Sequence, residues 1–374
     1  MIKIPQFVKN LKPYKAGKPI SELAREQNIT KIVKLASNEN PLGPSPKAVE
    51  AIQKALSGLN RYTDPLSHDL VMAIANKYNV LPNHVICGHG TDSLLAYIVN
   101  AFTTESDEIL TSEGTFIGIY VSIRKYGRKL VMVPLKDYSF DLDAICSAIT
   151  DKTVMIYLAN PNNPTGTMFE RDEFEEFMAK VPNHIMVVLD EAYTTYADDN
   201  PNYPNGVRYD YDNMVVTRTL SKAYGLGGLR VGFAVGPDEV IESLYKVKLP
   251  FEPNLLAQQG AIAALDDDEF LLKTKELNKT SLAILKDGLE KIGISQVPTS
   301  ANFILSLMPT EQFAKELTDK CMNRGLILRH VNTFGIPTGV RINSGTIEET
   351  DFALEIIEKV YKTLCEKHKK TVKC

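Results

Sequence analysis

The chain has 374 residues, of which 44% are hydrophobic and 24% are charged, a composition typical of soluble globular proteins. Single cores rarely grow beyond roughly 250–300 residues, so this length predicts two domains. The net charge of −4 at pH 7 shows no basic bias. That charge argues against a nucleic-acid partner and favours a small-molecule one.

Cysteine and histidine patterns exclude several site classes. The five cysteines are scattered and odd in number, without a C-x-x-C pair, and the six histidines form no H-E-x-x-H pattern. We therefore expect a reducing compartment, with no disulfide framework and no metal site. The N-terminus lacks the apolar core of a signal peptide, and no run approaches the ~20 apolar residues of a membrane span. These features predict a cytoplasmic protein that does not contact a membrane.

The first helix signal lies near residue 45, and alternating strand and helix patterns follow it. Ser45 is a candidate N-cap and Pro46 a first helical residue, followed by apolar residues spaced by three and four. Short apolar runs then alternate with helical patterns, which predicts a mostly parallel central sheet flanked by helices. The runs expected to form strands are 84–87, 108–110, 153–159, 185–189, 214–217 and 229–236.

The pattern changes after the Pro-containing break PFEPN at 250–254. A helical region is expected over 255–292, and strand and helical pieces over 294–345. Thr346 and Glu349 form a capping box that predicts the start of a last helix. We therefore predict a large α/β domain at 47–254. Residues 1–46 and 255–374 would form a smaller α+β domain.

Polar residues follow several of the predicted strands. Ligands of open α/β sheets bind beyond the carboxyl ends of the strands, so these loops are expected to converge on one site. The loops are GHGTD at 88–92, TF at 115–116, NPNNPTG at 160–166, DEAY at 190–193 and SK at 221–222.

Taken one at a time, these residues have structural alternatives. The GHGTD loop opens a helix, whose N-terminus favours an anion such as phosphate, but it also fits a tight turn. Asp190 fits an ion pair with a protonated ring nitrogen, or a helix cap, and Tyr193 fits the same site or the core. Lys222 becomes a nucleophile if it is buried near cations, but it also fits a solvated loop. Arg230 fits either a phosphate or a structural carboxylate.

The stretch TLSKAYGLGGLRVGF at 219–233 resembles the lysine segment of fold type I aminotransferases, which use pyridoxal 5′-phosphate (PLP). The NPNNPTG, DEAY and GHGTD segments occur in the order of that family. Further segments narrow the resemblance to histidinol-phosphate aminotransferases, and together the motifs cover essentially the whole chain. These segments are LKPYKAGKP at 11–19, LASNENPLGPSP at 35–46, RYTD at 61–64, LRH at 328–330 and RINSGT at 341–346.

The resemblance implies a role for each matching residue at the cofactor. Lys222 would hold PLP covalently and move the proton during the reaction. Asp190 would pair with the pyridine nitrogen, and Phe116 would stack on the ring. Tyr193 and Asn163 would contact the phenolic oxygen. The residues implied to bind the phosphate are Gly90, Thr91, Asp92, Ser221 and Arg230.

The resemblance also implies substrate contacts and a composite site. Tyr62 would reach the cofactor phosphate of a partner subunit, which implies a homodimer. Arg341 would bind the anionic end of the substrate, Arg329 and Tyr14 would contact histidinol phosphate, and Asn40 would lie near the substrate.

Two positions depart from the family pattern. Thr63 replaces a proline in R-Y-P-D, for which we expect a changed turn with the Tyr62 contact kept. Gly114-Thr115 replaces Pro-Thr before Phe116, for which we expect a more mobile loop.

The implied activity is transamination between L-histidinol phosphate and 2-oxoglutarate in histidine biosynthesis, with imidazole acetol phosphate and glutamate as the other pair. One alternative is an aromatic or broad-specificity amino acid aminotransferase. A second is a PLP-dependent lyase that resembles threonine-phosphate decarboxylases. A third is a non-catalytic PLP-binding regulator, but such proteins append a DNA-binding domain and no segment of this chain fits one.

Overall fold

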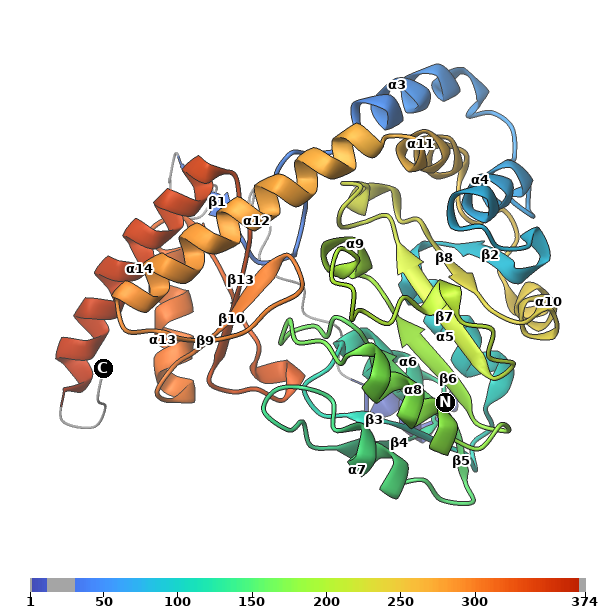
Figure 1. Ribbon diagram of the computed structural model, residues 1–374, viewed down its shortest axis with the longest axis horizontal. Helices are drawn as coiled ribbons and strands as arrows, with labels where there is room; N and C mark the ends of the chain where they lie inside the picture. Colours follow the sequence, from blue (N-terminus) through green and yellow to red (C-terminus); the bar gives the residue numbers. More distant parts are fainter. Residues whose placement is uncertain (1, 12–30, 370–374) are drawn as a thin grey trace.

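The computed structural model describes residues 2–11 and 31–369, which form a larger body and a smaller one joined by a long helix (Figure 1). The described α-helices are α1 (Gln6–Lys9), α3 (Pro46–Ala55), α4 (His68–Tyr78), α5 (Gly90–Phe102), α6 (Ile117–Lys125), α7 (Leu142–Ser147), α8 (Arg171–Lys180), α9 (Thr194–Ala197), α10 (Asp238–Val247), α11 (Leu255–Leu265), α12 (Asp268–Lys291), α13 (Glu311–Met322) and α14 (Ile347–His368). Short 3₁₀ helices are η1 (Leu56–Gly58), η2 (Pro82–His84), η3 (Gly206–Arg208), η4 (Gly227–Leu229) and η5 (Asn332–Phe334).

A seven-stranded sheet with the order β2-β8-β7-β6-β5-β3-β4 forms the centre of the larger body. Its strands are β2 (Val85–Gly88), β3 (Glu108–Ser112), β4 (Lys129–Val133), β5 (Thr153–Ala159), β6 (Met186–Asp190), β7 (Met214–Thr219) and β8 (Gly232–Val235). Neighbours from β7 to β4 pair in parallel, whereas β8 is antiparallel to both β2 and β7. The predicted mostly parallel sheet is confirmed. Neither the edge strand β4 nor the direction of β8 was among the sequence predictions.

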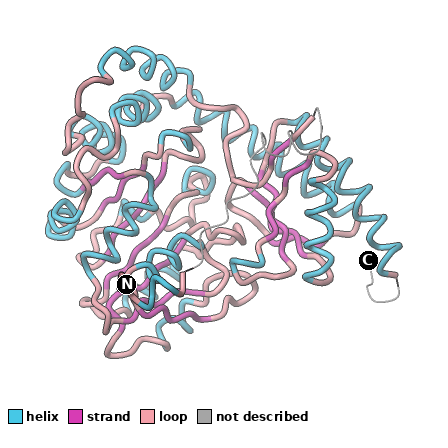
Figure 2. Tube along the Cα trace, turned by 180° about the vertical axis from the view of Figure 1, so that it is seen from behind, coloured by secondary structure: helices cyan, strands magenta, loops and turns pink. Residues whose placement is uncertain are grey.

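Helices cover both faces of this sheet, so its strands are buried on each side (Figure 2). In β2, Ile86 packs into the apolar layer on one face, while Val85 and Cys87 pack into the layer on the other. The strands therefore read as continuous apolar runs, because neither face alternates with polar residues. The partly exposed strand β4 lies at the edge and pairs only with β3, which explains its weaker apolar signal.

The smaller body contains a four-stranded antiparallel sheet with the order β12-β13-β10-β9. Its strands are β9 (Ser295–Val297), β10 (Phe303–Leu307), β12 (Arg329–His330) and β13 (Gly339–Asn343), and a separate parallel pair joins β1 (Val33–Lys34) to β11 (Leu326–Ile327). Helices α12 and α13 pack on this sheet, α14 packs on α12 and α13, and α12 runs from the larger body to the smaller one (Figure 1). The boundaries of the two domains, at residues 46 and 254, stay predictions.

Both helix starts argued from capping signals are present. The Ser45 hydroxyl accepts from Ala48 N at the start of α3, and Thr346 forms a reciprocal capping box with Glu349 at the start of α14. Ser45 Oγ also donates to Asp267 Oδ2 at 2.5 Å. Because Asp267 caps α12, this bond ties the start of α3 to the helix that joins the two bodies.

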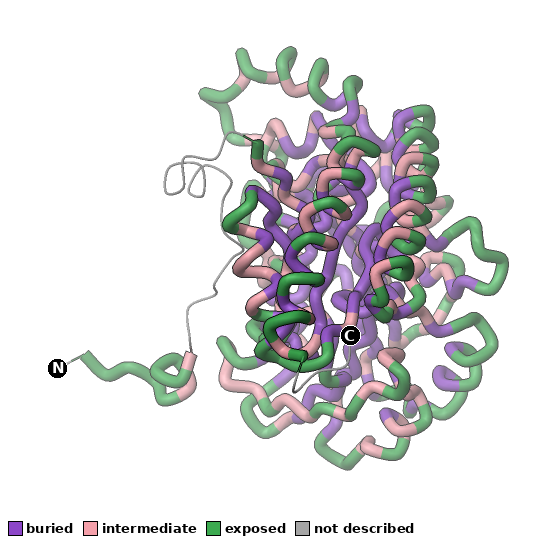
Figure 3. Tube along the Cα trace, turned by 90° about the vertical axis from the view of Figure 1, so that its left-hand side faces the viewer, coloured by how far each residue is buried: buried purple, intermediate pink, exposed green. Residues whose placement is uncertain are grey.

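Burial is concentrated inside the two bodies, whereas residues 2–11 are mostly exposed and project to one side (Figure 3). Among the residues described, no helix combines the length and apolar character needed to cross a membrane. Within 2–11 and 31–369, no group of three or more His, Cys, Asp or Glu side chains is placed to hold a metal ion.

Candidate active site

A cavity of about 190 Å³, partly open to solvent, lies where the carboxyl ends of β5, β6 and β7 meet the start of α5 and the smaller sheet. The predicted convergence of the polar loops is therefore observed. Eleven residues from the sequence prediction line the cavity: Thr91, Asp92, Phe116, Asn163, Asp190, Tyr193, Ser221, Lys222, Arg230, Arg329 and Arg341.

One end of the cavity combines hydrogen-bond donors with positive charge. Helix α5 begins at Gly90, so the first N–H groups of the helix have no intrahelical partner and present the positive end of its dipole. Arg230 lies beside it, with Nη1 at 3.4 Å from Ser221 Oγ and Nη2 at 3.1 Å from Asp92 Oδ2. Gly90 has a φ of +75°, and a Cβ there would lie 2.7 Å from Arg230 Nη2. The glycine therefore permits the close approach of the arginine, and this corner suits an anion.

Asp190 ends β6 with its carboxylate inside the cavity. Tyr157 Oη donates to Oδ2 at 2.7 Å, and Ala192 N donates to Oδ1 at 3.1 Å. Burial raises the pKa of Asp190 to about 6, although the Tyr157 hydrogen bond acts in the opposite direction. A buried carboxylate is costly to charge without a cation beside it. The site therefore favours a ligand that carries a positive charge near Asp190.

The next residue, Glu191, is directed to a separate ionic network. Arg218 Nη2 donates to Glu191 Oε2 at 2.6 Å, with both side chains buried, and the Arg218 guanidinium lies 4.8 Å from the centre of the Tyr78 ring. Neither Glu191 nor Arg218 lines the cavity. The two acidic residues of the DEAY motif therefore have different environments, one facing the cavity and one paired in the protein interior.

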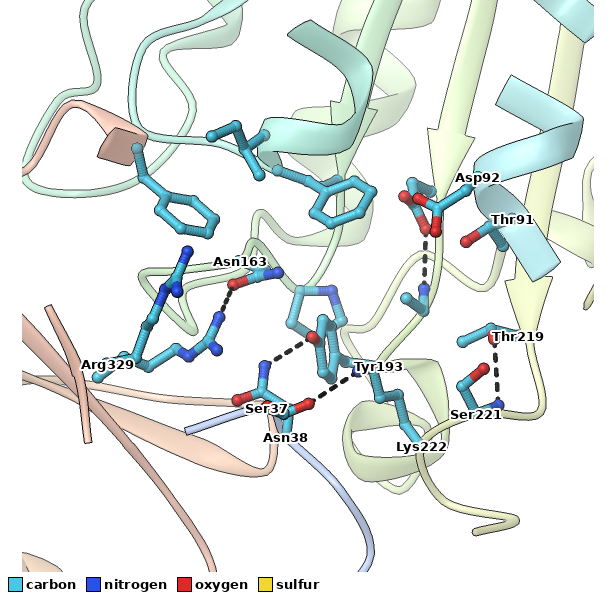
Figure 4. Close-up of a pocket in the computed structure, with 18 of the residues that line it drawn as sticks. Ser37, Asn38, Thr91, Asp92, Asn163, Tyr193, Thr219, Ser221, Lys222 and Arg329 are labelled. Carbon is cyan, nitrogen blue, oxygen red and sulfur yellow. Dashed lines mark hydrogen bonds between the residues drawn. The ribbon is translucent and has the colours of Figure 1, made fainter. Parts of the chain in front are cut away.

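Lys222 extends into the cavity from the loop after β7, as Figure 4 shows, and its Nζ donates to Ser37 O at 3.1 Å. Burial lowers the pKa of Lys222 to about 8, and the positive charges of Arg341 and Arg230 act in the same direction. A larger fraction of this amine is therefore neutral near pH 7 than for an exposed lysine. Such an amine can attack a carbonyl group.

The loop that carries Lys222 packs against the segment that precedes α3. Gly225 has a φ of +70°, and a Cβ at this position would lie 2.1 Å from Gly43 O. Both the backbone conformation and this contact require glycine. The LGP and AYG segments of two distant motifs are thus in direct contact, which fixes the lysine loop against the N-terminal part of the chain.

Tyr193, Asn163 and Arg341 meet on the side of the cavity nearest the smaller sheet. Arg341 is buried on β13, where Nη1 donates to Asn163 Oδ1 at 2.5 Å and Nη2 donates to Ala36 O at 2.7 Å. Both of these acceptors are neutral oxygens. Tyr193 is also buried, and burial raises the pKa of its hydroxyl, partly offset by the nearby Arg341. This side of the cavity therefore combines a cation with a protonated phenol.

A second arginine lies beside the first. Arg329 on β12 pairs in register with Arg341 on β13, which places the two residues on neighbouring strands. Their guanidinium groups lie 5.7 Å and 6.0 Å from the centre of the Phe334 ring. Two cations on one wall favour an anionic ligand group, and the aromatic ring offers an apolar surface next to them.

The loop before Phe116 is held by the NPNNPTG segment. Thr115 Oγ1 donates to Asn162 Oδ1 at 2.7 Å, and Asn162 Nδ2 donates to Gly114 O at 3.0 Å. These bonds hold Gly114, which departs from the family pattern, and the neighbouring Thr115, and Phe116 lines the cavity. The expected mobility of this loop stays a prediction.

Three predicted site residues that the structure describes do not line the cavity, and a fourth lies outside the described residues. Gly90 lies in close contact with the Arg230 guanidinium, as described above. Asn40 is buried, with Nδ2 donating to Ala223 O at 2.8 Å and to Thr274 Oγ1 at 3.0 Å. Tyr62 is 84% exposed, and its ring stacks on Phe251 with centroids 4.4 Å apart. Tyr14 lies outside the described residues, so its role stays a prediction.

Four polar or aromatic side chains in the cavity lining were missed from the sequence. Ser37 and Asn38 belong to the LASNENPLGPSP segment, and Thr219 begins the lysine segment. These three lie inside quoted motifs, so the motifs themselves contained a signal. Phe334 occurs in no motif, and only its place in the fold identifies it.

The comparisons with known proteins agree over most of the chain. Residues 30–357 match the family model described as aminotransferase class I and II. A curated relative named histidinol-phosphate aminotransferase 2, from Haemophilus influenzae (strain 86-028NP), is 41% identical over 357 residues, which cover 95% of this chain and 97% of the relative. Histidinol-phosphate aminotransferase from Methylobacillus flagellatus is 39% identical and covers 96% of this chain and 97% of its own length.

A solved structure shares the whole architecture. The histidinol-phosphate aminotransferase from Sinorhizobium meliloti, in complex with pyridoxal-5′-phosphate, superposes with a TM-score of 0.91 at 26% identity. The alignment covers 97% of this chain and 99% of the other. The fold, with its larger and smaller bodies, is therefore common to both proteins.

Proposed function

The chain belongs to the class I and II aminotransferase family, and from that premise we propose that it transfers an amino group between L-histidinol phosphate and 2-oxoglutarate, with PLP as cofactor. The predicted PLP-dependent fold type I aminotransferase is confirmed by the family match. One observation carries the proposal for this chain. Three groups face one cavity: Lys222 with its lowered pKa, the buried carboxylate of Asp190, and the positive end of the α5 dipole. Two arginines line the same cavity. In the biosynthetic direction, glutamate would supply the amino group to imidazole acetol phosphate.

The cavity fits PLP on its chemistry. PLP carries a phosphate, a ring nitrogen that accepts a proton, and an aldehyde. The phosphate suits the α5 start with Thr91, Ser221 and Arg230, and the protonated nitrogen suits the buried carboxylate of Asp190. The aldehyde suits the amine of Lys222. We assign Phe116 to the ring face.

We assign two further polar side chains, those of Tyr193 and Asn163, to the phenolic oxygen of PLP. Tyr193 and Asn163 both line the cavity on the side of Arg341. A phenol and an amide are both able to donate to an anionic oxygen. These two assignments come from the resemblance together with the shared position of the two side chains.

Bound PLP supplies an electron sink for the charge that develops when the substrate loses its Cα proton. The chain supplies the proton transfer, because Lys222 Nζ takes the proton from Cα and later returns one. A positioned acid–base group contributes typically about 10²–10⁴-fold to the rate. Asp190 holds the ring nitrogen in its protonated form through opposite charge, which strengthens the sink.

The two arginines account for the anionic substrates. Histidinol phosphate carries a phosphate, and glutamate carries two carboxylates. Arg341 and Arg329 share one wall, and a guanidinium binds either kind of anion in a bidentate way. We propose that the same wall receives each substrate in turn. The curated relatives in the comparison are named histidinol-phosphate aminotransferases, and nothing among them favours the decarboxylase or the aromatic alternative.

We propose a homodimer with composite sites. The segments 59–66 and 248–251 pack together, with the Tyr62 ring on Phe251 and Lys248 Nζ donating to Pro65 O at 2.9 Å. They nevertheless leave large apolar side chains exposed, namely Leu59, Tyr62, Leu66, Leu249 and Phe251. Clustered exposed apolar side chains mark interaction surfaces. A second copy would cover this surface and place Tyr62 at the cofactor phosphate of its partner.

Steady-state kinetics test the proposed function. The purified protein with PLP is assayed with L-histidinol phosphate and with phenylalanine and tyrosine, using 2-oxoglutarate as acceptor, and carbon dioxide release is measured in parallel. We expect glutamate formation, ping-pong kinetics and a higher kcat/KM for histidinol phosphate. Lys222→Ala serves as the control and should abolish turnover. A preference for the aromatic amino acids, or carbon dioxide as the product, would contradict the proposal.

A further inference from the structure

Asn38 is a buried cavity residue with an unusual backbone conformation. Its φ is +55°, in the left-handed region that asparagine and glycine tolerate best. The backbone is held from two sides, because Asn38 N donates to Asn343 Oδ1 at 3.2 Å and Asn302 Nδ2 donates to Asn38 O at 3.2 Å. Glycine would satisfy the same conformation and both bonds. The backbone at this position therefore does not require the asparagine side chain, so the role of that side chain must be sought in its own contacts.

That side chain points to the hydroxyl of Tyr193, as the dashed line in Figure 4 shows. Asn38 Nδ2 donates to Tyr193 Oη at 2.7 Å, while Asn38 Oδ1 is buried and has no hydrogen-bond partner among the described residues. A phenol has one hydrogen to donate. Because the Tyr193 oxygen accepts from Asn38, the hydroxyl hydrogen of Tyr193 can be donated to a different acceptor.

The surroundings of Tyr193 limit where that hydrogen points. Its ring is buried, 3% exposed, and packs edge-on against Phe303 with centroids 5.2 Å apart. Within the described part of the chain, its hydroxyl makes no other hydrogen bond. Tyr193 itself lines the cavity, so the cavity offers the direction in which its hydrogen finds an acceptor.

We propose that Asn38 is a positioning residue that, by donating to Tyr193 Oη, directs the Tyr193 hydrogen into the cavity, where it is donated to the phenolic oxygen of PLP. This inference rests on the proposed function, because PLP supplies the acceptor. Asn38 acts through Tyr193 and extends the set of residues assigned to that oxygen. The reverse orientation of the amide, with Oδ1 facing the phenol, would instead direct the phenolic hydrogen to Asn38. The two orientations make opposite predictions for an Asn38→Asp variant.

A double-mutant cycle on cofactor binding tests the coupling. The dissociation constant of PLP is measured on apoenzyme for the wild type, Asn38→Gly, Tyr193→Phe and the double variant. Loss of one neutral hydrogen bond predicts a weakening of about 3- to 10-fold for Asn38→Gly. In the Tyr193→Phe background the same change should have almost no effect, because the hydroxyl on which Asn38 acts is absent. Equal effects in both backgrounds, or none in the wild type, would overturn the inference.

The Asn38→Asp variant separates donor from acceptor. Aspartate has nearly the same shape and tolerates the same backbone region, but its carboxylate only accepts hydrogen bonds. We expect it to take the phenolic hydrogen and to weaken PLP binding at least as much as Asn38→Gly. Unchanged PLP affinity in this variant would overturn the inference, since it would mean that Asn38 accepts from Tyr193.

Two further measurements separate the possible outcomes. The absorbance of bound PLP is titrated across neutral pH, and Asn38→Gly should shift the midpoint in the same direction as Tyr193→Phe. A purely structural role for Asn38 would leave that midpoint in place, which would contradict the inference. Thermal unfolding of each apoenzyme verifies that the variants fold. If the wild type itself fails to bind PLP, the proposed function is wrong, whereas failure of the cycle alone removes only the role of Asn38.

Discussion

The lowered pKa of Lys222 predicts an amine that is far more reactive at neutral pH than an ordinary lysine. With a pKa of about 8, roughly a tenth of Lys222 is neutral at about pH 7. A lysine with the ordinary pKa of about 10.4 is neutral in only about one molecule in 2,500. Burial and the charges of Arg341 and Arg230 therefore raise the reactive fraction roughly 200-fold.

Competitive acetylation of the apoenzyme measures this fraction. The protein is exposed briefly to acetic anhydride at a series of pH values, and the peptide that contains Lys222 is quantified by mass spectrometry. The labelling rate should rise to half its maximum near pH 8. The exposed lysines of the same digest serve as the internal reference.

Arg341→Gln is the matched perturbation for this assay. It removes the positive charge that ranks after burial among the causes of the lowered pKa of Lys222, so the midpoint should move to higher pH. The reasoning would be refuted if Lys222 in the wild type were labelled with the same midpoint pH as the exposed lysines. It would also be refuted if Arg341→Gln left the midpoint pH of Lys222 unchanged. The first result would mean that the amine is solvated, and the second that burial alone sets its pKa.

The same shifts predict how apoenzyme stability depends on pH. Lys222 holds its proton less tightly in the folded chain, so its contribution makes the unfolding free energy rise with pH between about 8 and about 10.4. The contribution of Asp190 to the unfolding free energy changes with pH in the opposite direction. Because its folded pKa is raised to about 6, the folded chain binds the proton more tightly, and this contribution is lost as pH rises from about 4 through 6. Denaturant unfolding of the apoenzyme at a series of pH values measures the sum.

Three substitutions probe other parts of the proposal. Tyr62→Phe should weaken PLP binding about 10-fold or more through loss of a charged hydrogen bond, and unchanged affinity in equilibrium titration would remove Tyr62 from the site. Arg341→Ala should raise KM for histidinol phosphate by about 10- to 100-fold and affect the PLP dissociation constant much less, and the reverse pattern would contradict its role. Gly225→Ala should lower the unfolding free energy by more than about 1 kcal/mol, because its Cβ would lie 2.1 Å from Gly43 O. The control Gly228→Ala, with no atom within 4 Å, should change stability by about 0.5 kcal/mol or less in denaturant unfolding.

Much of the fold was predictable because its signals are local. The predicted strands between β2 and β8 are mostly apolar, since both faces of the sheet are covered. Helix starts at Ser45 and Thr346 depend on side chains within three residues of the cap. By contrast, the antiparallel direction of β8 depends on which strands it joins, and nothing within residues 232–235 encodes that choice.

The same distinction between local signals and tertiary contacts applies to the residues of the candidate site. Lys222, Asp190 and Arg230 were identifiable because each lies at or near the end of a strand in a distinctive motif, and parallel strands bring such residues to one edge. What those residues contact was decided by tertiary structure. Glu191 follows Asp190 directly, yet it pairs with Arg218 in the interior.

By itself, the sequence indicated the family, most strands of the large sheet and the residues that we propose to hold PLP, because these depend on local patterns and on motif order. Only the tertiary structure decided which distant side chains meet. Asn38 and Tyr193 are 155 positions apart, and their hydrogen bond exists because the fold brings the segment that contains Asn38 next to the residues that follow β6. No local pattern encodes such a contact, since its geometry depends on how the two bodies pack around the cavity.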